Sequence, residues 1–432
     1  MEENPTETVR KRGRARNLVL HLHPARVRKE SIRFTLTFGL GGMAALLFLM
    51  QLLTGMLMRF TYIPTPTEAY DSILVMKNEL LFGRLVRNLH HWSGILFVIV
   101  TFLHLLRTFY TGAFYHERRW NWIIGLVLMV LVVFSNFSGY LLPWDQLAYW
   151  AVTVSTAMLH YVPYVGNSLV TIVRGGVDVN SSTLLLFYNF HTAILPLSIA
   201  LLMAFHFWRV RKNKGVVVRA EASPETVPSD PDLVAKELVT GLALIAFLFI
   251  LAIFLEAPLQ ERANPASSPN PAKAAWYFMG VQELLLHFHP FVAAFLIPTA
   301  VLVFLISIPY LNYDQEYRGK WFFTDKGKRI SVYAMIIGSL FTLALIFTEE
   351  YLVNTETLFP DLLPVLANGI IPLIIPAGLF VLIVLYMKRQ FRTDKSETVL
   401  FVFTFLMAGY AVLSIIGIWF RGPSMEIMWY AP

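Results

Sequence analysis

The sequence predicts an all-α transmembrane fold, and three observations support this prediction. Of the 432 residues, 56% are hydrophobic and only 15% are charged, which is a poor match to a soluble domain. Apolar runs of about 18 residues or more recur along the chain, each long enough to cross a hydrocarbon layer of ~30 Å as a helix. The basic segments lie before the first run and after every second run, so each is separated from the next by two spans and all of them lie on one side of the membrane.

We expect nine spans, near residues 36–58, 92–110, 121–142, 186–208, 238–256, 291–309, 331–348, 366–387 and 398–420. The first 30 residues are polar and basic, without a cleavable signal peptide, and are expected to form a cytoplasmic tail. The positive-inside rule explains the net charge of +7 as membrane topology, which argues against nucleic acid as a partner. A polar, Pro-rich stretch at 212–232 is expected to link the first four spans to the last five.

Four histidines recur at matched distances on the second and fourth predicted spans. His90 and His104 are 14 residues apart, and His191 and His206 are 15 apart, which corresponds to ~21 and ~22.5 Å of helix rise. Both spans run in the same direction, so His90 should lie level with His191 near the outer face, and His104 with His206 near the inner face. A lone buried histidine is more often a hydrogen-bonded packing residue. Four at two matched depths favour two bis-histidine hemes inside a four-helix bundle.

Glycines repeat the same interval on the first and third spans, as Gly41 with Gly55 and Gly125 with Gly139. Each pair alone would indicate close helix packing, but beside the histidines the four favour clearance for two stacked macrocycles. Arg87, one turn before His90, is a candidate partner for a heme propionate, and an interfacial anchor explains it equally well. Cysteine is absent, so the hemes would be noncovalent b-type groups and the chain cannot ligate an iron–sulfur cluster through thiolates.

These features resemble the cytochrome b of the quinol–cytochrome c and quinol–plastocyanin oxidoreductases, the bc complexes. The resemblance is carried by NLHHWSG at 88–94 together with His104, SGYLLPWDQLAYWAVTVST at 138–156, STLLLFYNFHTAILP at 182–196 and ERANPASSPNPAKAAWYFMGVQELL at 261–285. The 15-residue interval between His191 and His206 is similar to that of the chloroplast-type cytochrome. The second half is similar to the separate subunit IV of that complex, here fused and extended by two spans.

The resemblance implies a division of the chain into a basic tail (1–30), a four-helix heme-binding domain (31–211), a polar linker (212–232), a subunit IV-like quinol-site domain (233–350) and two additional spans (351–432). It implies that one electron of each quinol goes to a Rieske iron–sulfur protein. The other electron crosses the membrane through the two b hemes to an inner quinone site, with protons released outside and taken up inside.

The implied partners are the Rieske protein, a c-type cytochrome or other acceptor subunit, membrane lipid and a second copy of the complex, in a prokaryotic cytoplasmic membrane. A diheme membrane anchor for another quinone-linked oxidoreductase is the alternative, but such an anchor needs only one quinone site. A transporter would leave the four histidines without a role, and the sequence has no internal repeat.

The resemblance also points to quinol-site residues in two outer loops. Asp145 in PWDQ and the Trp276–Tyr277 pair are expected to wall a quinol pocket. The family's usual Pro-Glu-Trp-Tyr motif reads Ala-Ala-Trp-Tyr here, so its carboxylate is missing, and Lys273 makes the variant similar to those of menaquinol-linked members. Glu283 is the candidate proton acceptor, with a pKa raised by burial, and Asp145 and Tyr277 are further possibilities. A helix-cap or interfacial role for Glu283 is the alternative.

Three further expectations concern the inner face and the end of the chain. Family members with a covalent c-type heme attach it at the position of Gly39, and without cysteine no such heme can form on this chain. Arg211 is a candidate contact for an inner propionate or quinone, with a positive-inside anchor as the alternative. The last two spans have no charged residue or histidine in their interiors, so we expect them to face lipid or dock a partner subunit.

Overall fold

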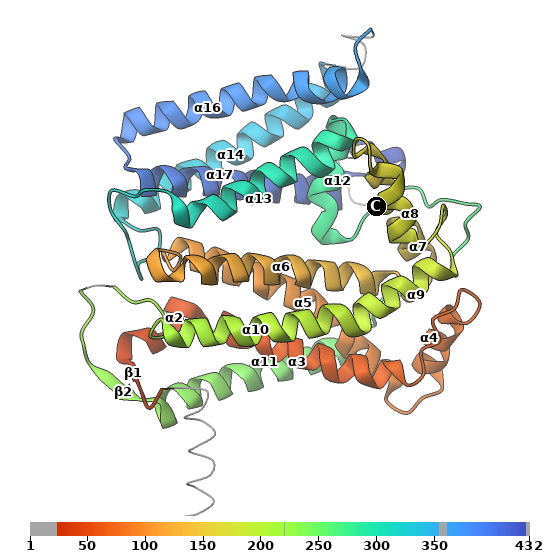
Figure 1. Ribbon diagram of the computed structural model, residues 1–432, viewed down its shortest axis with the longest axis horizontal. Coiled ribbons are helices and arrows are strands. Elements are labelled where there is room, and N and C mark those ends of the chain that lie inside the picture. Colours follow the sequence, from red (N-terminus) through yellow and green to blue (C-terminus); the bar gives the residue numbers. More distant parts are fainter. Residues whose placement is uncertain (1–23, 220, 354–360, 429–432) are drawn as a thin grey trace, which may run out of the picture.

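The computed structural model describes residues 24–219, 221–353 and 361–428, which form a bundle of long, roughly parallel helices (Figure 1). Within these residues, nine helices are long and apolar enough to cross a membrane, and they confirm all nine predicted spans. They are Leu40–Arg59, Gly83–Tyr110, His116–Tyr140, Ser181–Lys212, Ser229–Phe254, Val292–Tyr310, Asp325–Tyr351, Leu366–Phe391 and Lys395–Phe420. Most of the predicted basic tail, and residues 354–360 of an outer loop, lie outside the described residues.

The spans are built mainly from regular α-helix. Their α-helices are α3 (Leu40–Arg59), α5 (Gly83–Tyr110), α6 (Arg119–Tyr140), α10 (Leu195–Lys212), α11 (Val234–Phe254), α13 (Ile297–Ser307), α14 (Asp325–Tyr351), α16 (Ile371–Phe391) and α17 (Lys395–Ile415). Single π-helical turns extend five of them, at Phe190–Ile194, Ser229–Leu233, Val292–Leu296, Leu366–Ile370 and Ile416–Phe420. A helix satisfies its backbone polar groups internally, which is what a lipid environment demands of a spanning segment.

Shorter elements gather at the two ends of the bundle. One end carries α4 (Ala69–Asn78), α7 (Gln146–Ala157), α8 (Gly166–Arg174), α9 (Ser181–Asn189) and α12 (Met279–His287) (Figure 1). The opposite end carries α2 (Phe34–Thr37) and the strands β1 (Arg26–Arg28) and β2 (Thr226–Pro228). Brief 3₁₀ turns occur at Lys29–Ile32, His116–Arg118, Met158–Tyr161, Trp276–Phe278, Ile308–Tyr310 and Pro423–Met425. We call the α7–α8 end the outer end and the β1–β2 end the inner end.

The predicted basic segments meet at the inner end. Strands β1 and β2 pair antiparallel, with Val27 opposite Val227, so the polar linker folds back onto the segment before the first span. Arg118 donates a hydrogen bond to the carbonyl of Asn213 across 2.5 Å, which ties the loop before α6 to the end of α10. The gathering of basic segments at one end agrees with the charge pattern. Which side of the membrane this end faces stays a prediction.

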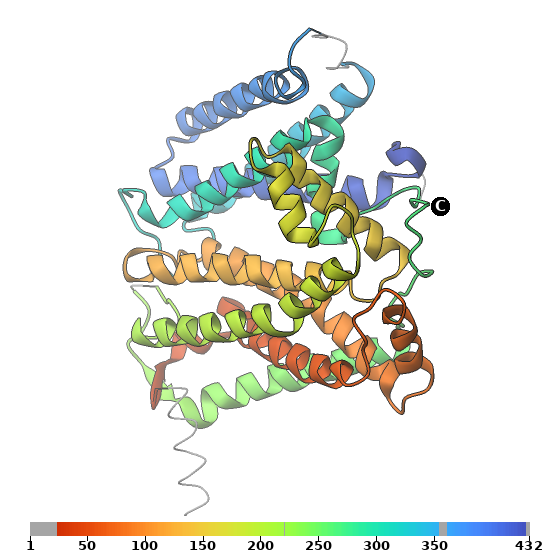
Figure 2. The same ribbon diagram turned by 45° about the vertical axis from the view of Figure 1, so that its right-hand side comes forward.

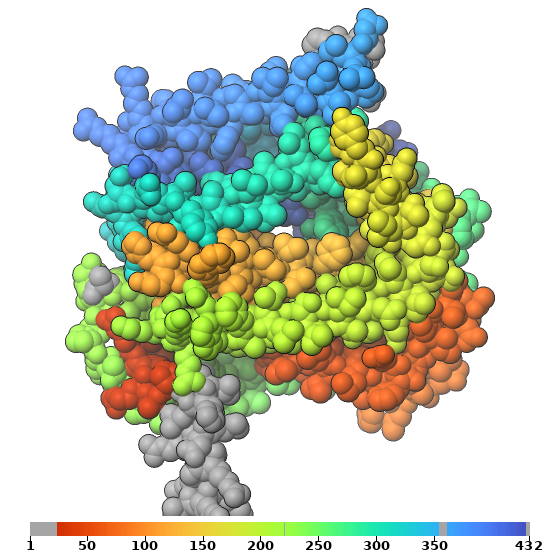
Figure 3. Space-filling model, viewed as in Figure 1, coloured from red at the N-terminus to blue at the C-terminus, as the bar shows by residue number. Residues whose placement is uncertain are grey.

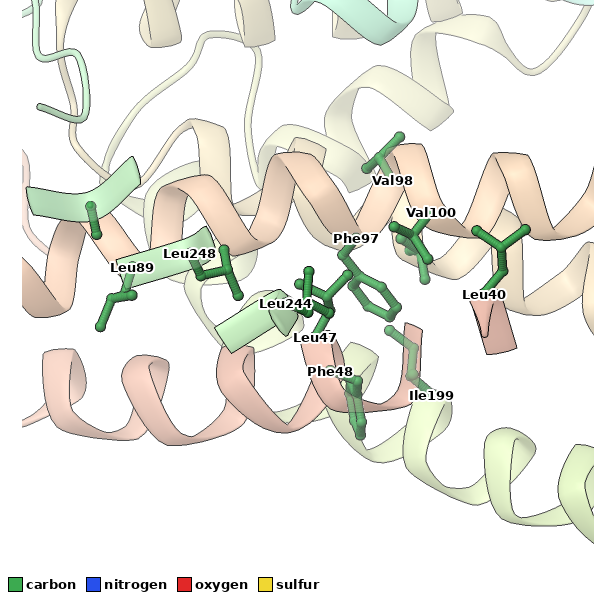
Figure 4. Packing of buried hydrophobic residues seen from close by; sticks show 12 residues of the cluster. Leu40, Leu47, Phe48, Leu89, Phe97, Val98, Val100, Ile199, Leu244 and Leu248 are labelled. Atoms are coloured by element: carbon green, nitrogen blue, oxygen red, sulfur yellow. The ribbon is translucent and has the colours of Figure 1, made fainter. Parts of the chain in front are cut away.

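The core of the first half lies between α3, α5, α10 and α11. Leu47 and Phe48 of α3 pack with Phe97 of α5, Ile199 of α10 and Leu244 of α11 in one buried cluster (Figure 4). Lipid chains are as apolar as these side chains, so close packing rather than transfer from water holds such helices together. This packing keeps α5 and α10, which carry the four histidines, in fixed positions.

The last two spans differ in their surroundings. Only 6% of the α16 span is buried inside the protein, against 44% of the α17 span, and α16 is the outermost helix on its side of the bundle (Figures 1 and 2). Phe403 of α17 stacks on Phe109 of α5 with ring centroids 3.7 Å apart. The expectation that both spans face lipid or a partner is therefore wrong for α17, which packs against α5 in the first half of the chain.

Candidate functional site

The structure brings the four histidines together in the two expected pairs. The ring centroids of His90 and His191 are 6.1 Å apart with the rings at 78°, and those of His104 and His206 are 6.5 Å apart at 74°. A metal–imidazole bond of about 2 Å, plus ~1.1 Å from nitrogen to ring centre, puts two imidazoles on opposite sides of one metal at about 6 Å. The spacing of both pairs therefore suits a metal held between them.

Hydrogen bonds fix how the outer two imidazoles are turned. His191 Nδ1 lies 2.9 Å from the carbonyl oxygen of Ser135, which can only accept, so Nδ1 carries the proton. His90 Nδ1 lies 2.9 Å from Thr54 Oγ1, whose own proton goes to the carbonyl of Met50 at 2.6 Å. Both histidines thus donate through Nδ1 and keep the Nε2 lone pair for a ligand. Such outer partners orient metal-binding histidines.

The four predicted glycines lie against these imidazoles. A Cβ built on Gly139 would be 2.5 Å from Cε1 of His191, and one on Gly55 would be 3.1 Å from Cε1 of His90. At the inner pair, Gly41 would approach His104 to 3.3 Å and Gly125 would approach His206 to 3.6 Å. Gly139, Gly55 and Gly41 therefore make room for the histidine rings, most tightly at the outer pair, whereas a Cβ at Gly125 would make an ordinary contact. Clearance for a macrocycle stays a prediction.

The two predicted arginines occupy different surroundings. Arg87 is buried and donates to the carbonyls of Ala257 and Pro258, at 2.7 and 2.6 Å, so it fastens α5 to the segment after α11. Arg211 is exposed near the inner end of α10. Contacts of either residue to a propionate or quinone stay predictions.

The two outer loops of the predicted pocket are joined to each other. Asp145 accepts hydrogen bonds from the amides of Ala148 and Gln260, at 2.9 and 3.0 Å, which caps α7 and holds the loop after α11. Gln146 adds a bond from its amide to the carbonyl of Glu261 at 2.7 Å. Burial raises the pKa of Asp145, and the two amides act in the opposite direction. The loops that the sequence predicts to meet do meet, and Asp145 holds them in place.

Trp276 is partly exposed and contacts Tyr277, while Tyr277 and Phe278 pack against the first half of the chain. Phe278 contacts Phe137 of α6 with ring centroids 5.6 Å apart, and Tyr277 packs against the core cluster of the first half. The Tyr277 hydroxyl is buried and has no hydrogen-bond partner among the described residues. Burial also raises its pKa. The surface is hollowed nearby, between α6 and α13 beside α8 (Figure 3).

Glu283 belongs to an ion cluster that the sequence analysis missed. It is fully buried and receives hydrogen bonds from Arg421, the shortest 2.7 Å, and from His287 at 3.2 Å. Arg421 also binds Glu350 at 2.9 Å, and the second nitrogen of His287 binds Glu349. Burial raises the pKa of Glu283, but His287 and Arg421 outweigh it and the pKa is lowered. The expected raised pKa is therefore wrong.

The cluster gives the protein a predicted pH dependence above neutrality. Burial lowers the pKa of His287, but Glu283 and Glu349 outweigh it and raise the pKa to about 9 from 6.5. A group whose pKa is higher in the folded state stabilises it fully below pH 6.5 and loses that contribution as pH rises through about 9. We expect the melting temperature to fall across this window, and to fall less in His287→Gln.

His289→Gln is the matched control for this measurement, because burial lowers the pKa of His289 and it does not titrate in that window. Equal slopes of melting temperature against pH in the parent protein and His287→Gln would contradict the role of His287.

Comparison with known proteins shows to which family the first half of the chain is similar. A family model described as Cytochrome b/b6/petB matches residues 27–214. Cytochrome b6 of Acaryochloris marina is 44% identical over 174 residues, which are 40% of this chain and 81% of that protein. The chain belongs to the cytochrome b/b6 family. Cytochrome b6 of Synechocystis sp. is 43% identical over 174 residues, covering 78% of its length.

The fold of this cytochrome b/b6 family member is similar to that of a solved structure beyond the first half of the chain as well. A solved structure titled "Hyperthermophilic respiratory Complex III" superposes with a TM-score of 0.67 at 24% identity, covering 87% of this chain and 96% of that one. The family and the nine spans identify an integral, multi-pass cytochrome b of the bc type, and the solved structure shows that its fold is shared over most of the chain. The family implies b-type hemes. The predicted resemblance to a chloroplast-type cytochrome with a further C-terminal half is thereby confirmed.

Proposed function

We propose that this cytochrome b carries two b-type hemes and passes one electron of each quinol from an outer site to an inner quinone site. The facing histidine pairs carry this proposal, because both pairs have the spacing that suits one metal and the outer two imidazoles also keep their Nε2 lone pairs free. His90 with His191 would hold the outer heme, and His104 with His206 the inner one. Heme iron, when bound, supplies one-electron oxidation and reduction.

The separation of the two pairs supports a role in energy conversion. Fourteen residues of α5 separate His90 from His104, which is ~21 Å along the membrane normal. Moving one elementary charge across a membrane is worth ~2.3 kcal/mol per 100 mV. An electron carried from the outer to the inner pair would therefore work against the membrane potential. Proton release at the outer end and uptake at the inner end would complete proton translocation.

Quinol oxidation would take place against Trp276 and Tyr277 at the outer end. The buried Tyr277 hydroxyl needs a hydrogen-bond partner, and a quinol hydroxyl could supply it. Oxidation of one quinol to quinone releases two electrons and two protons, with one electron going to a Rieske protein and the other to the outer heme. Burial raises the pKa of Tyr277, so its hydroxyl stays protonated and is proposed as a hydrogen-bond partner of the quinol, while the carboxylates Glu283 and Asp145 are the candidate proton acceptors.

The partners and setting follow from the same chemistry. The sequence has no cysteine for an iron–sulfur cluster or a covalent heme, which supports a Rieske iron–sulfur protein and a c-type cytochrome or other acceptor as partner subunits. We place the complex as a dimer in a prokaryotic cytoplasmic membrane, with the basic inner end on the cytoplasmic side. Arg87 and Arg211 are proposed as contacts for propionate or quinone. Lys273 favours a menaquinol-type substrate.

An optical redox titration of the purified complex tests the proposal. We expect two b-type transitions of equal amplitude, and reduction of one of them by added quinol when the Rieske protein is oxidised. A single transition, or two that quinol cannot reduce, would refute a diheme quinol-oxidising subunit.

A further inference from the structure

We propose that α17, the last span, is a positioning element for the quinol-oxidation site, with Tyr410 and Arg421 as its positioning residues. This inference rests on the proposed function, because it assigns to the C-terminal extension the task of holding Trp276 and Tyr277 in place. The family model ends at residue 214, so neither it nor the resemblance gives α17 a role.

Hydrogen bonds from three residues, in α17 and just after it, tie this end of the chain to the segment that carries Trp276 and Tyr277. The Tyr410 hydroxyl donates to the carbonyl of Tyr277 at 2.8 Å. The ammonium of Lys273 donates to the carbonyl of Ile418 at 3.0 Å. Arg421 then grips Glu283, one and a half turns beyond Tyr277, through Nη2 at 2.7 Å and Nε at 3.1 Å. The segment is thus held before, at and after the Trp-Tyr pair.

Glycines bring α17 and α12 close enough for these bonds. A Cβ on Gly280 would lie 2.7 Å from the Tyr410 ring and 2.8 Å from Ser414 Oγ, and one on Gly417 would lie 3.0 Å from the carbonyl oxygen of Met279. A larger residue at either position would therefore push the two helices apart. A contact this close fixes the register of α12 against α17.

The backbone and the side chain of Tyr277 contact different parts of the protein. Its backbone carbonyl is held by Tyr410, while its ring packs against the core of the first half. A shift of the carbonyl would move the hydroxyl that faces the proposed quinol. Misplacement of a reacting group by 1 Å can lower a rate by about 10²-fold, so small shifts are expected to be visible in turnover.

Arg421 is suited to this task by its burial and its shape. Its side chain is 1% exposed and forks between Glu283 of α12 and Glu350 of α14, so it joins three helices at one point. A guanidinium makes several directed hydrogen bonds at once, whereas an ammonium is a point charge on a flexible stem. Arg421→Lys would therefore keep the charge of the cluster and lose part of its geometry.

Tyr410→Phe in the complete complex is the decisive variant, because it removes one hydroxyl and keeps the ring against Gly280. We expect kcat for quinol oxidation, per heme, to fall about tenfold, with both heme potentials, the heme content and the melting temperature unchanged. Tyr110→Phe is the matched control, since the Tyr110 hydroxyl also bonds α17, at Thr404 and 3.2 Å, but at the inner half of the bundle. It should leave quinol oxidation at the parent rate.

Arg421→Lys and Arg421→Gln add a graded series, with Lys expected to retain more turnover than Gln. A purely structural role for α17 would lower the melting temperature and heme content of these variants and of Tyr410→Phe while turnover per heme stayed at the parent value. That result overturns the inference. The proposed function fails separately, if the parent complex itself does not oxidise quinol or shows fewer than two b-type transitions.

Discussion

Replacing His191 with leucine will remove one of the two b-type redox transitions and lower quinol-dependent turnover by ~100-fold or more. His191 donates through Nδ1 to Ser135 and faces His90 at 6.1 Å, so the variant leaves His90 as a single ligand. The inner pair, His104 of α5 with His206 of α10, lies ~21 Å away along the helices and should keep its heme. A titration should therefore show one transition, reducible by dithionite and not by quinol.

His91→Leu is the matched control for this experiment. His91 is next to His90 on α5, but its ring contacts Trp92, with centroids 5.0 Å apart, rather than the imidazole of another helix. Both transitions and most of the turnover should persist in this variant. Two intact transitions in His191→Leu would disprove the ligand assignment, and loss of both in His91→Leu would show that histidines near this end act through packing.

The sequence predicted the first half of the chain well because the signals there are the length of apolar runs and regular intervals between residues. Spans follow from apolar length, and the histidine pairs follow from two intervals on two helices that run in the same direction. The unequal intervals of 14 and 15 residues have a structural reason that the sequence did not reveal. His191 lies in the π-helical turn Phe190–Ile194, and a π turn accommodates one extra residue within a continuing helix. The longer interval thus covers a comparable depth.

The ion cluster could not be predicted because its members are far apart in the chain. Glu283 and Arg421 are 138 residues apart, and the cluster also draws Glu349 and Glu350 from the end of α14. Nothing periodic links these positions, and each one alone is typical of an interfacial charge. One signal was available: Glu283 and His287 are four residues apart on one helix face, a spacing at which side chains meet.

The composition of α17 also did not reveal its surroundings in the fold. Its interior is apolar, without charge or histidine, and this pattern fits a helix in lipid and a helix inside a membrane protein equally well. Only the surroundings separate the two cases: Phe403 of α17 contacts Phe109 of α5, whereas only 6% of the α16 span is buried inside the protein. Hydropathy finds spans but does not say which of them lies in the centre of a bundle.

Replacing Gly139 with alanine should also remove the outer heme. Alanine variants of all four glycines together should show whether their spacing serves the histidine rings or the macrocycles. A Cβ at Gly139 would stand 2.5 Å from Cε1 and 3.0 Å from both ring nitrogens of His191, so the imidazole must move off its position. Overpacking of this kind costs about 1–3 kcal/mol, and here the displaced group is a ligand. We expect Gly139→Ala to lose the outer transition while the inner one remains.

Gly125→Ala is the comparison, because its Cβ would be 3.6 Å from Cε1 of His206, an ordinary contact. If the glycines make room for the histidine rings, loss of heme should follow the distances, with Gly139 most sensitive, then Gly55, then Gly41, and Gly125 least. If they make room for the macrocycles, all four alanine variants should lose heme to a similar extent. Heme content per polypeptide, measured for the four variants side by side, separates these explanations, and the contacts within the chain favour the graded result.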